Sequence, residues 1–162
     1  MEVILDSNEF IFGFTKSEKV YADLLKLIGI KFNVTLPDVI FREVFDKLKI
    51  LEGKDFASAA RYAILKMDIK IVDEKLVPQE LIQKYYSIIK KRPDAAIAAF
   101  TEWIGAKYLV SENRHFLYTL KRKPFEVLNA ENFISVLEKS ENMPKSGFGS
   151  QPKLKLFDEK EN

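Results

Sequence analysis

Short apolar segments alternate with longer segments of helical periodicity over most of the chain. Residues 3–5 (VIL), 34–36 (VTL) and 69–72 (IKIV) are rich in β-branched residues and are predicted to be strands. Residues 108–111 (YLVS) and 125–128 (FEVL) are predicted as two further strands. Because helical segments separate these strands, the pattern predicts a parallel or mostly parallel sheet with helices on both faces.

The helices are predicted from apolar residues that recur three or four positions apart. They cover residues 17–28, 37–49, 55–66, 80–91, 93–104 and 112–116, and a last helix follows Asn129. Proline stands at the start of two of them, at Pro37 and Pro93, where its missing N–H costs little. In helix 37–49 we expect Val39, Phe41, Val44, Phe45 and Leu48 to form the buried side.

The composition excludes several kinds of functional site. The 162 residues include no cysteine and one histidine, which rules out a disulfide framework, a thiolate nucleophile and a multi-histidine zinc site. A metal site in this chain therefore needs oxygen ligands, which favours Mg²⁺ or Mn²⁺. The net charge of +2 is too small to indicate nucleic-acid binding by itself.

We expect one domain over residues 1–140 and a flexible C-terminal tail over residues 141–162, where proline, glycine and serine concentrate. A docking peptide is the alternative for the tail, because Gln151, Leu154 and Phe157 weakly resemble a sliding-clamp-binding box. No apolar run reaches the length of a membrane span, and the first residues lack the basic start of a signal peptide. The sequence therefore predicts a cytoplasmic protein that does not bind a membrane.

Three carboxylates stand where an unpaired charge is costly. Asp6 follows the first buried strand, Glu43 shares the inward side of its helix with Val39, and Asp94 begins a nearly continuous apolar helix. Ligands of open parallel sheets bind beyond the carboxyl ends of the strands, which is where Asp6 is expected. Clustered carboxylates repel one another without a cation. A divalent metal removes that repulsion, polarises phosphoryl oxygens and lowers the pKa of a bound water.

Each acid also has a purely structural explanation. Asp6 can cap the helix that follows it, Asp94 is stabilising in the first turn of a helix, and Glu43 can lie in water at a helix edge. The residues Asp6-Ser7-Asn8 are expected to leave the sheet as a loop. Phe10, Phe12 and Phe14, which follow, are expected to be core or dimer contacts.

Four motifs occur in a characteristic order. They are the apolar strand with Asp6-Ser7-Asn8, Pro37 with Glu43, Asp94-Ala95-x-Ile97-Ala98, and residues 108–116 (YLVSENRHF). In this order they resemble the PIN-domain nuclease family, whose small members include the VapC-type toxins of toxin–antitoxin pairs. The resemblance covers about residues 1–139. It implies a three-layer α/β/α sandwich with a mostly parallel central sheet, and a Mg²⁺- or Mn²⁺-dependent ribonuclease.

The resemblance also implies roles for individual residues. Asp6, Glu43 and Asp94 correspond to the metal-binding acids, Ser111 corresponds to a small hydroxyl residue that orients the site, and Asn8 lies close to it. Asn113 departs from the fullest pattern, because many members carry a fourth acid there and others carry Asn. Its carbonyl can still bind a metal-bound water, so the resemblance leaves open whether the site holds one metal ion or two.

The residues that flank these motifs each have a functional and a structural interpretation. Glu112 adjoins Asn113, but its side chain is expected to point elsewhere. His115 is expected to be a surface or packing residue rather than a general base. The basic residues that flank two acidic motifs suit phosphate binding and a solvated surface equally: Lys90, Lys91, Arg92 and Arg114.

The predicted function is therefore a metal-dependent endoribonuclease that hydrolyses RNA phosphodiester bonds, with Asp6, Glu43, Asp94, Ser111 and Asn113 in its active site. Such a protein can be the toxin of a toxin–antitoxin pair, with an antitoxin and a second copy of itself as partners. The alternative is a catalytically weak or inactive PIN-like module that binds RNA or a protein. A domain for small phosphoryl ligands is disfavoured, because the chain has no glycine-rich phosphate loop.

Overall fold

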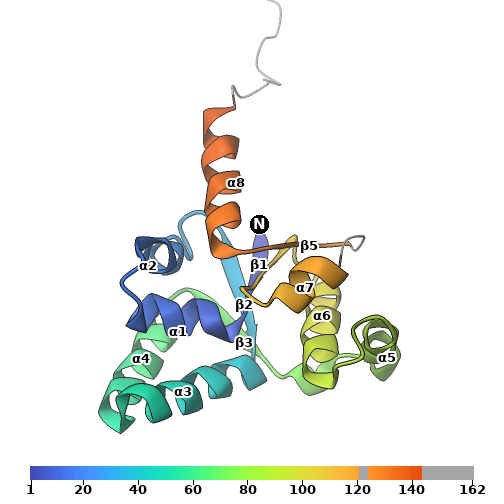
Figure 1. Ribbon diagram of the computed structural model, residues 1–162, viewed down its shortest axis with the longest axis horizontal. Helices are drawn as coiled ribbons and strands as arrows, with labels where there is room; N and C mark the ends of the chain where they lie inside the picture. The colour runs from blue at the N-terminus through green and yellow to red at the C-terminus, as the bar shows by residue number, and fades with distance from the viewer. Residues whose placement is uncertain (121–123, 144–162) are drawn as a thin grey trace, which may run out of the picture.

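Figure 1 shows the computed structural model of the chain, which describes residues 1–120 and 124–143. Within these residues, five strands form one sheet in the order β3-β2-β1-β4-β5, and every neighbouring pair is parallel. The strands are β1 (Glu2–Leu5), β2 (Asn33–Pro37), β3 (Ile69–Val72), β4 (Tyr108–Val110) and β5 (Glu126–Leu128). The predicted parallel sheet is confirmed.

Helices cover both faces of this sheet. In Figure 1, α1, α2 and α4 lie on one side of the strands, and α5, α6 and α7 lie on the other. The bounds are α1 (Ser7–Thr15), α2 (Lys19–Lys26), α3 (Asp38–Glu52), α4 (Lys54–Lys66), α5 (Gln79–Ile89), α6 (Arg92–Ile104), α7 (Arg114–Thr119) and α8 (Ala130–Asn142), with a 3₁₀ turn at Glu74–Leu76. The expected three-layer α/β/α arrangement is therefore confirmed. No helix in the described ranges is long and apolar enough to cross a membrane.

The central strand β1 forms the middle of the core. Its last three side chains, Val3, Ile4 and Leu5, are fully buried, because β1 is paired with a strand on each edge and covered by helices on each face. Ile4 pairs with Leu109 and Leu5 with Val110, so the ends of β1 and β4 lie next to each other. This register places the residues that follow these two strands at one point.

The loop predicted for residues 6–8 is wrong, because helix α1 begins at Ser7. Asp6 is its N-cap, and the Asp6 Oδ1 accepts a hydrogen bond from the Ser7 N–H at 2.8 Å. Inside α1, Gly13 serves packing rather than a turn. A Cβ atom at Gly13 would lie 2.4 Å from the Leu25 Cδ1 of α2. The missing side chain therefore lets the two helices approach closely.

The buried side predicted for α3 is shifted from the observed one. Ile40, Val44 and Leu48, spaced four positions apart, are fully buried, whereas Val39 is 38% exposed. Val39 lies in the first turn of α3, where its backbone N–H donates to Glu74 at 3.2 Å. The prediction that Val39 is buried is therefore wrong, because the stripe that faces the core starts at Ile40.

Several other helix boundaries differ from the predictions by a few residues, and two of these differences involve a change of assignment. The helix predicted over residues 80–91 ends at Ile89, since Lys90 adopts a left-handed conformation with φ 56° and Arg92 begins α6. At the C-terminus, α8 continues to Asn142 and so includes two residues that were assigned to the tail. Residues 144–162, which contain Gln151, Leu154 and Phe157, lie outside the described residues.

The burial of β1 gives a stability prediction. Ile4→Ala should lower the free energy of unfolding by about 2–5 kcal/mol, because it removes a fully buried side chain and leaves a cavity. The matched variant Ile50→Ala changes a side chain that is 84% exposed and should stay within about 0.5 kcal/mol of wild type. Urea unfolding followed by circular dichroism measures both. Equal losses in the two variants would contradict the central position of β1.

Candidate functional site

The candidate site lies at the carboxyl ends of β1 and β4, where the strand order reverses direction. In the order β3-β2-β1-β4-β5, the chain continues from β1 to β2 on one side, while β4 and β5 occupy the other side. Such a switch point is the usual ligand crevice of an open parallel sheet. The Asp6 N–H donates to the Val110 carbonyl oxygen at 2.9 Å, which ties the two strand ends together.

Asp6 is the buried acid of the site, with 8% of its surface exposed. Its Oδ1 accepts from the Ser7 N–H, and its Oδ2 accepts from the Ser111 hydroxyl at 2.8 Å. Burial raises the pKa of the Asp6 carboxyl, the two hydrogen bonds oppose this rise, and the nearby Glu43 and Asp94 carboxylates add to it. Both oxygens of Asp6 therefore have hydrogen-bond donors, while burial and the two neighbouring carboxylates still disfavour its negative charge.

Glu43 reaches the site from α3. The Ser7 hydroxyl donates to the Glu43 Oε1 at 3.3 Å, so Ser7 contacts Asp6 through its backbone and Glu43 through its side chain. The same Oε1 forms an ion pair with the Lys47 ammonium at 2.5 Å, one turn further along the helix. Both side chains of this pair are more than one third exposed, and such ion pairs contribute little to stability. Lys47 is therefore an exchangeable partner.

Asp94 lies in the first turn of α6 and is 7% exposed. Its Oδ2 accepts from the Asn113 side-chain amide at 3.4 Å and lies 3.7 Å from the Lys91 ammonium. The N-terminus of a helix favours a negative charge at this position without any metal. Asp94 therefore combines a helix-stabilising position with a place among the acids around Asp6.

The two ends of the Asn113 side-chain amide contact different neighbours. Its side-chain oxygen accepts from the His115 N–H at 3.0 Å and caps α7, whereas its amide group donates to Asp94. Its own N–H donates to the Ser111 hydroxyl at 3.1 Å. In this arrangement Asn113 presents a donor, and not its carbonyl oxygen, to the acids. The cap of α7 thus decides which end of the amide faces the site.

A second pair of acids, Glu9 and Glu112, adjoins the site. Glu9 lies on α1 and is fully buried, and burial, together with the nearby Glu112 carboxylate, raises the pKa of Glu9 to about 10. Glu112 itself accepts from the N–H of Ala130, the first residue of α8, at 2.9 Å, so its side chain is directed to the start of this helix, whose N-cap is Asn129. The burial of Glu9 could not be predicted from the sequence, because it follows only once α1 is known to start at Ser7.

The remaining predicted residues lie at the starts of the helices that carry the acids or their partners. His115 is exposed, and its Nε2 lies 3.1 Å from the Ile89 carbonyl oxygen at the end of α5. Asn8 is partly exposed in the first turn of α1. Arg92 and Arg114 are exposed first residues of α6 and α7, the two helices whose N-terminal ends carry Asp94 and the Asn113 cap.

The donor atoms of the site suit a hard divalent cation. Asp6, Glu43 and Asp94 supply carboxylate oxygens and Ser111 supplies a hydroxyl oxygen, the ligand types that Mg²⁺ and Mn²⁺ prefer. Across the described part of the chain, no three acidic or histidine side chains already form a closed ligand cluster. Glu43 is held by Lys47, and Asp94 by Asn113 and Lys91, so the acids are neighbours whose oxygens have other partners.

The buried Glu9 carboxyl predicts a pH dependence of stability. Its pKa is about 10 in the folded chain against an ordinary value of 4.5, so the folded state binds the proton more tightly. The stabilisation is complete below pH 4.5 and is lost as the pH rises toward 10. Glu9→Gln cannot ionise, so its melting temperature should rise relative to wild type as the pH increases from 5 to 9.

Thermal unfolding of both proteins in metal-free buffers across this range measures the difference. The exposed Glu138→Gln on α8 removes the same charge without this burial and serves as the matched control. A constant difference between Glu9→Gln and wild type at all pH values would show that Glu9 does not keep its proton in the folded chain.

Two solved structures share this architecture. A chain of VapBC2 from Rickettsia felis, bound to a DNA fragment from their promoter, matches with a TM-score of 0.65 and 16% identity, over 80% of this chain and 98% of that one. VapC20 of Mycobacterium tuberculosis, a Sarcin-Ricin loop cleaving toxin, matches with a TM-score of 0.51 and 14% identity, over 66% of this chain and 86% of that one. No protein-family model matches the sequence, and no curated protein matches it significantly. At these identities the likeness is one of architecture, and the chain has a PIN-like fold of the VapC type.

Proposed function

We propose that the protein is a metal-dependent endoribonuclease. The observation that carries this proposal is the position of Asp6, a carboxylate at the switch point of the sheet. Its burial and the two nearby acids, Glu43 and Asp94, disfavour its charged form. Perturbed acids in such a crevice are typical of catalytic centres. The structural neighbour described as a Sarcin-Ricin loop cleaving toxin supports the same class of reaction.

Asp6, Glu43 and Asp94 would hold Mg²⁺ or Mn²⁺. When bound, such an ion stabilises negative charge on a phosphoryl oxygen and lowers the pKa of a coordinated water. Ser111 fixes the orientation of the Asp6 carboxylate through its 2.8 Å hydrogen bond, and Asn113 does the same for Asp94 at 3.4 Å. These two residues are positioning residues of the proposed site.

The exposed residues around the acids suit a polyanionic substrate. Arg92 and Arg114 begin two helices at the rim of the site, and Asn8 is partly exposed beside Asp6. Arginine and asparagine side chains at such positions bind phosphate and sugar oxygens without selecting a sequence. We propose RNA as the substrate on this basis.

The likeness to a VapBC2 structure supports two further partners. We propose that the protein acts in the cytoplasm as the toxin of a toxin–antitoxin pair, with a protein antitoxin that blocks the acids and with a second copy of the chain in a homodimer.

One observation favours the second function, that of an inactive RNA- or protein-binding module. Asn113 brings no charge, and Lys91 and Lys47 already neutralise Asp94 and Glu43. Calorimetric titration with Mn²⁺ distinguishes the two functions. The nuclease should bind the ion in a manner that Asp94→Ala abolishes, and the inactive module should not bind it.

Asp6→Asn tests the nuclease directly. The variant keeps the size of Asp6 and one of its two acceptor oxygens but removes its charge. Cleavage of single-stranded RNA with Mn²⁺ should therefore fall about 100- to 1,000-fold, the equivalent of several kcal/mol of lost charge stabilisation. Gel analysis of a labelled RNA, with and without chelator, measures the rate. Asp46→Asn, an exposed acid on α3, is the matched control and should cleave like wild type. Full activity of Asp6→Asn would overturn the active-site assignment.

Asn113→Asp tests whether the missing acid limits metal binding. Asp keeps the cap of α7 but replaces the amide donor beside Asp94 with a second carboxylate. Without metal, the variant should lose about 1 kcal/mol of stability through the lost hydrogen bond. With Mn²⁺, its affinity for the ion should rise on the order of tenfold, because an added carboxylate attracts the cation.

Calorimetry and thermal unfolding with and without Mn²⁺ measure the two effects of Asn113→Asp. The exposed Asn33→Asp at the start of β2, at the opposite end of the sheet, should change neither quantity. A variant Asn113→Asp with unchanged Mn²⁺ affinity would show that residue 113 does not face the bound ion.

A further inference from the structure

A pocket of about 380 Å³ lies between α5 and the first turns of α3 and α6. Its walls combine apolar groups with side chains that hydrogen-bond, and the residues on which the inference depends are Val39, Gln79, Ile82, Gln83, Tyr86 and Arg92. Ligand pockets with a few polar groups on a largely apolar wall begin at about 300 Å³. The pocket is therefore large enough for a small planar ligand group.

The pocket adjoins two of the three acids. Val39 lies four residues before Glu43 on the same face of α3, a rise of about 6 Å along the helix. Arg92 lies two residues before Asp94 in the first turn of α6. Two residues of the pocket wall thus stand within about one helical turn of Glu43 and Asp94 along their own helices, so the pocket adjoins the site in which we propose that RNA is cut.

Helix α5 presents one continuous stripe to the pocket. Gln79, Ile82, Gln83 and Tyr86 follow the spacing i, i+3, i+4 and i+7, which places them on a single face of the helix. The Lys90 N–H donates to the Tyr86 carbonyl oxygen at 2.8 Å and closes the turn after which Arg92 begins α6. This tight turn is what brings the arginine back to the pocket that Tyr86 lines.

We infer that this pocket takes a nucleobase of single-stranded RNA, with the neighbouring phosphate at the acids. The inference rests on the proposed ribonuclease function. The ring of Tyr86 is 38% exposed and can stack on a base, and the amides of Gln79 and Gln83 each carry a donor and an acceptor for its edge. Arg92 adds a charge that suits the adjoining phosphate.

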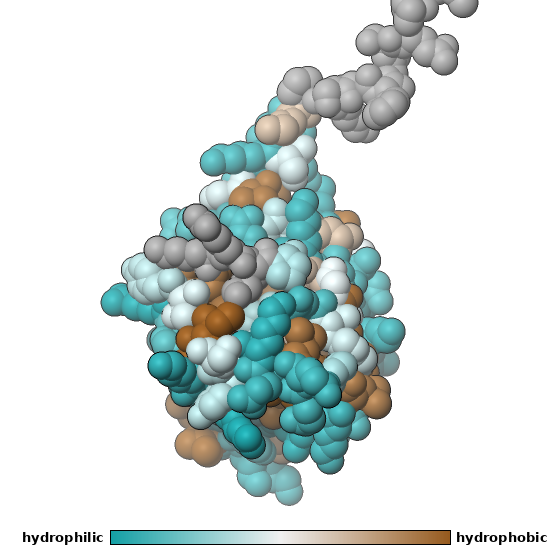
Figure 2. Space-filling view, turned by 90° about the vertical axis from the view of Figure 1, so that its right-hand side faces the viewer, coloured by the Kyte–Doolittle hydropathy of each residue, from teal (hydrophilic) through white to brown (hydrophobic). Residues whose placement is uncertain are grey.

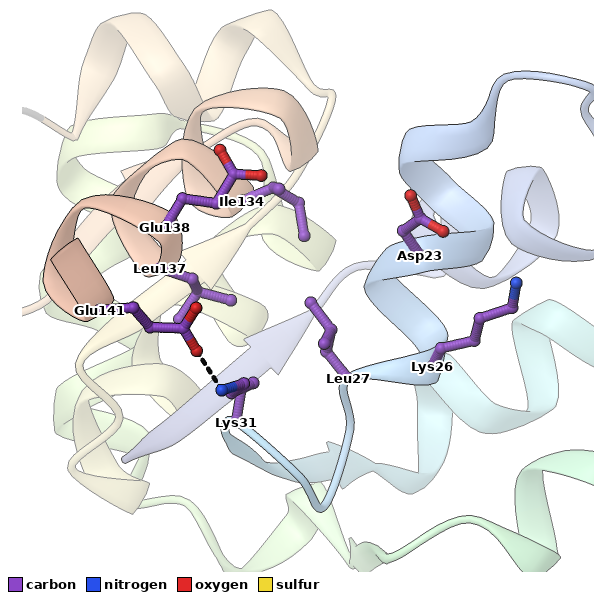
Figure 3. Close-up of a pocket in the computed structure, with 8 residues that line it drawn as sticks. All are labelled: Asp23, Lys26, Leu27, Lys31, Ile134, Leu137, Glu138 and Glu141. Atoms are coloured by element: carbon purple, nitrogen blue, oxygen red, sulfur yellow. Dashed lines mark ion pairs between the residues drawn. The ribbon is translucent and has the colours of Figure 1, made fainter.

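A second groove of the described surface is less suited to a base at the proposed site. Figure 2 views the α5 side of the molecule and shows hydrophilic side chains interrupted by a few hydrophobic patches. A groove of about 340 Å³ between α2 and α8, shown in Figure 3, is bordered by the Lys31–Glu141 ion pair. Because Lys31 precedes the start of β2, this groove lies at the amino ends of the strands, away from the acids.

Binding without cleavage tests the inference. The full chain is titrated, in a chelating buffer that prevents metal-dependent cleavage, into a fluorescein-labelled single-stranded RNA about 12 nucleotides long. A second probe is an abasic ribose-phosphate oligomer of the same length, which keeps the backbone charge but offers no base. Fluorescence anisotropy should show tighter binding of the RNA than of the abasic oligomer.

Tyr86→Ala should weaken RNA binding about 5- to 150-fold, the range for the loss of one base–aromatic stack, and leave binding of the abasic oligomer unchanged. Tyr86→Phe should retain the affinity for RNA. Gln83→Ala changes an exposed side chain of the same pocket and should also weaken RNA binding selectively. Tyr62→Ala on α4, where the tyrosine is 63% exposed, is the matched control and should bind both probes like wild type.

Two results overturn the inference: equal affinity of wild type and Tyr86→Ala for RNA, or a wild-type dimer in light scattering that Tyr86→Ala converts to a monomer. The second result would assign the pocket to self-association. These results are distinguishable from failure of the proposed function. Selective RNA binding that depends on Tyr86, in a protein that does not cleave RNA, supports the pocket while refuting the nuclease.

Discussion

The burial of the Asp6 carboxylate between the ends of β1 and β4 is the constraint on which the rest of the site depends. One oxygen accepts from the Ser7 N–H and starts α1, and the other accepts from the Ser111 hydroxyl, which lies 105 residues further along the chain. These bonds satisfy hydrogen-bonding capacity, yet burial still raises the pKa of the group. The fold thus holds a carboxylate in place at an energetic cost, which is typical of functional sites rather than of structural caps.

The strands and the positions of the acids at their ends could be predicted, because both depend on short segments of the sequence. An apolar run such as Val3–Leu5 predicts a buried strand, and once the sheet is parallel the residues after its strands converge on one edge. Helix α1 could not be predicted in this way, because Phe10, Phe12 and Phe14 alternate with the period of a strand and Gly13 interrupts the helical pattern. The role of Gly13 becomes visible only through its contact with Leu25 of α2.

The chemistry presented by a predicted residue was harder to derive than its position. Asn113 is a predicted member of the site, but the direction of its amide depends on the N-cap of α7, where its oxygen accepts from the His115 N–H. Val39 shows the same limit on α3, since its expected burial fails when the true stripe begins at Ile40. In both cases the outcome depends on tertiary contacts: on which neighbour hydrogen-bonds to the Asn113 oxygen, and on which face of α3 packs against the core.

If the protein acts on RNA as proposed, the charges around the acids explain how a chain with a net charge of only +2 can attract this polyanion. What matters for association is the local potential, and here each outer acid is paired with a lysine: Glu43 with Lys47, and Asp94 with Lys91. These pairs are partly exposed and therefore weak. If the acids hold a divalent cation as proposed, that cation replaces the lysines as their partner. The two ammonium groups then join Arg92 at the rim as free positive charges, so that metal binding and attraction of a phosphate backbone reinforce each other at the same edge of the sheet.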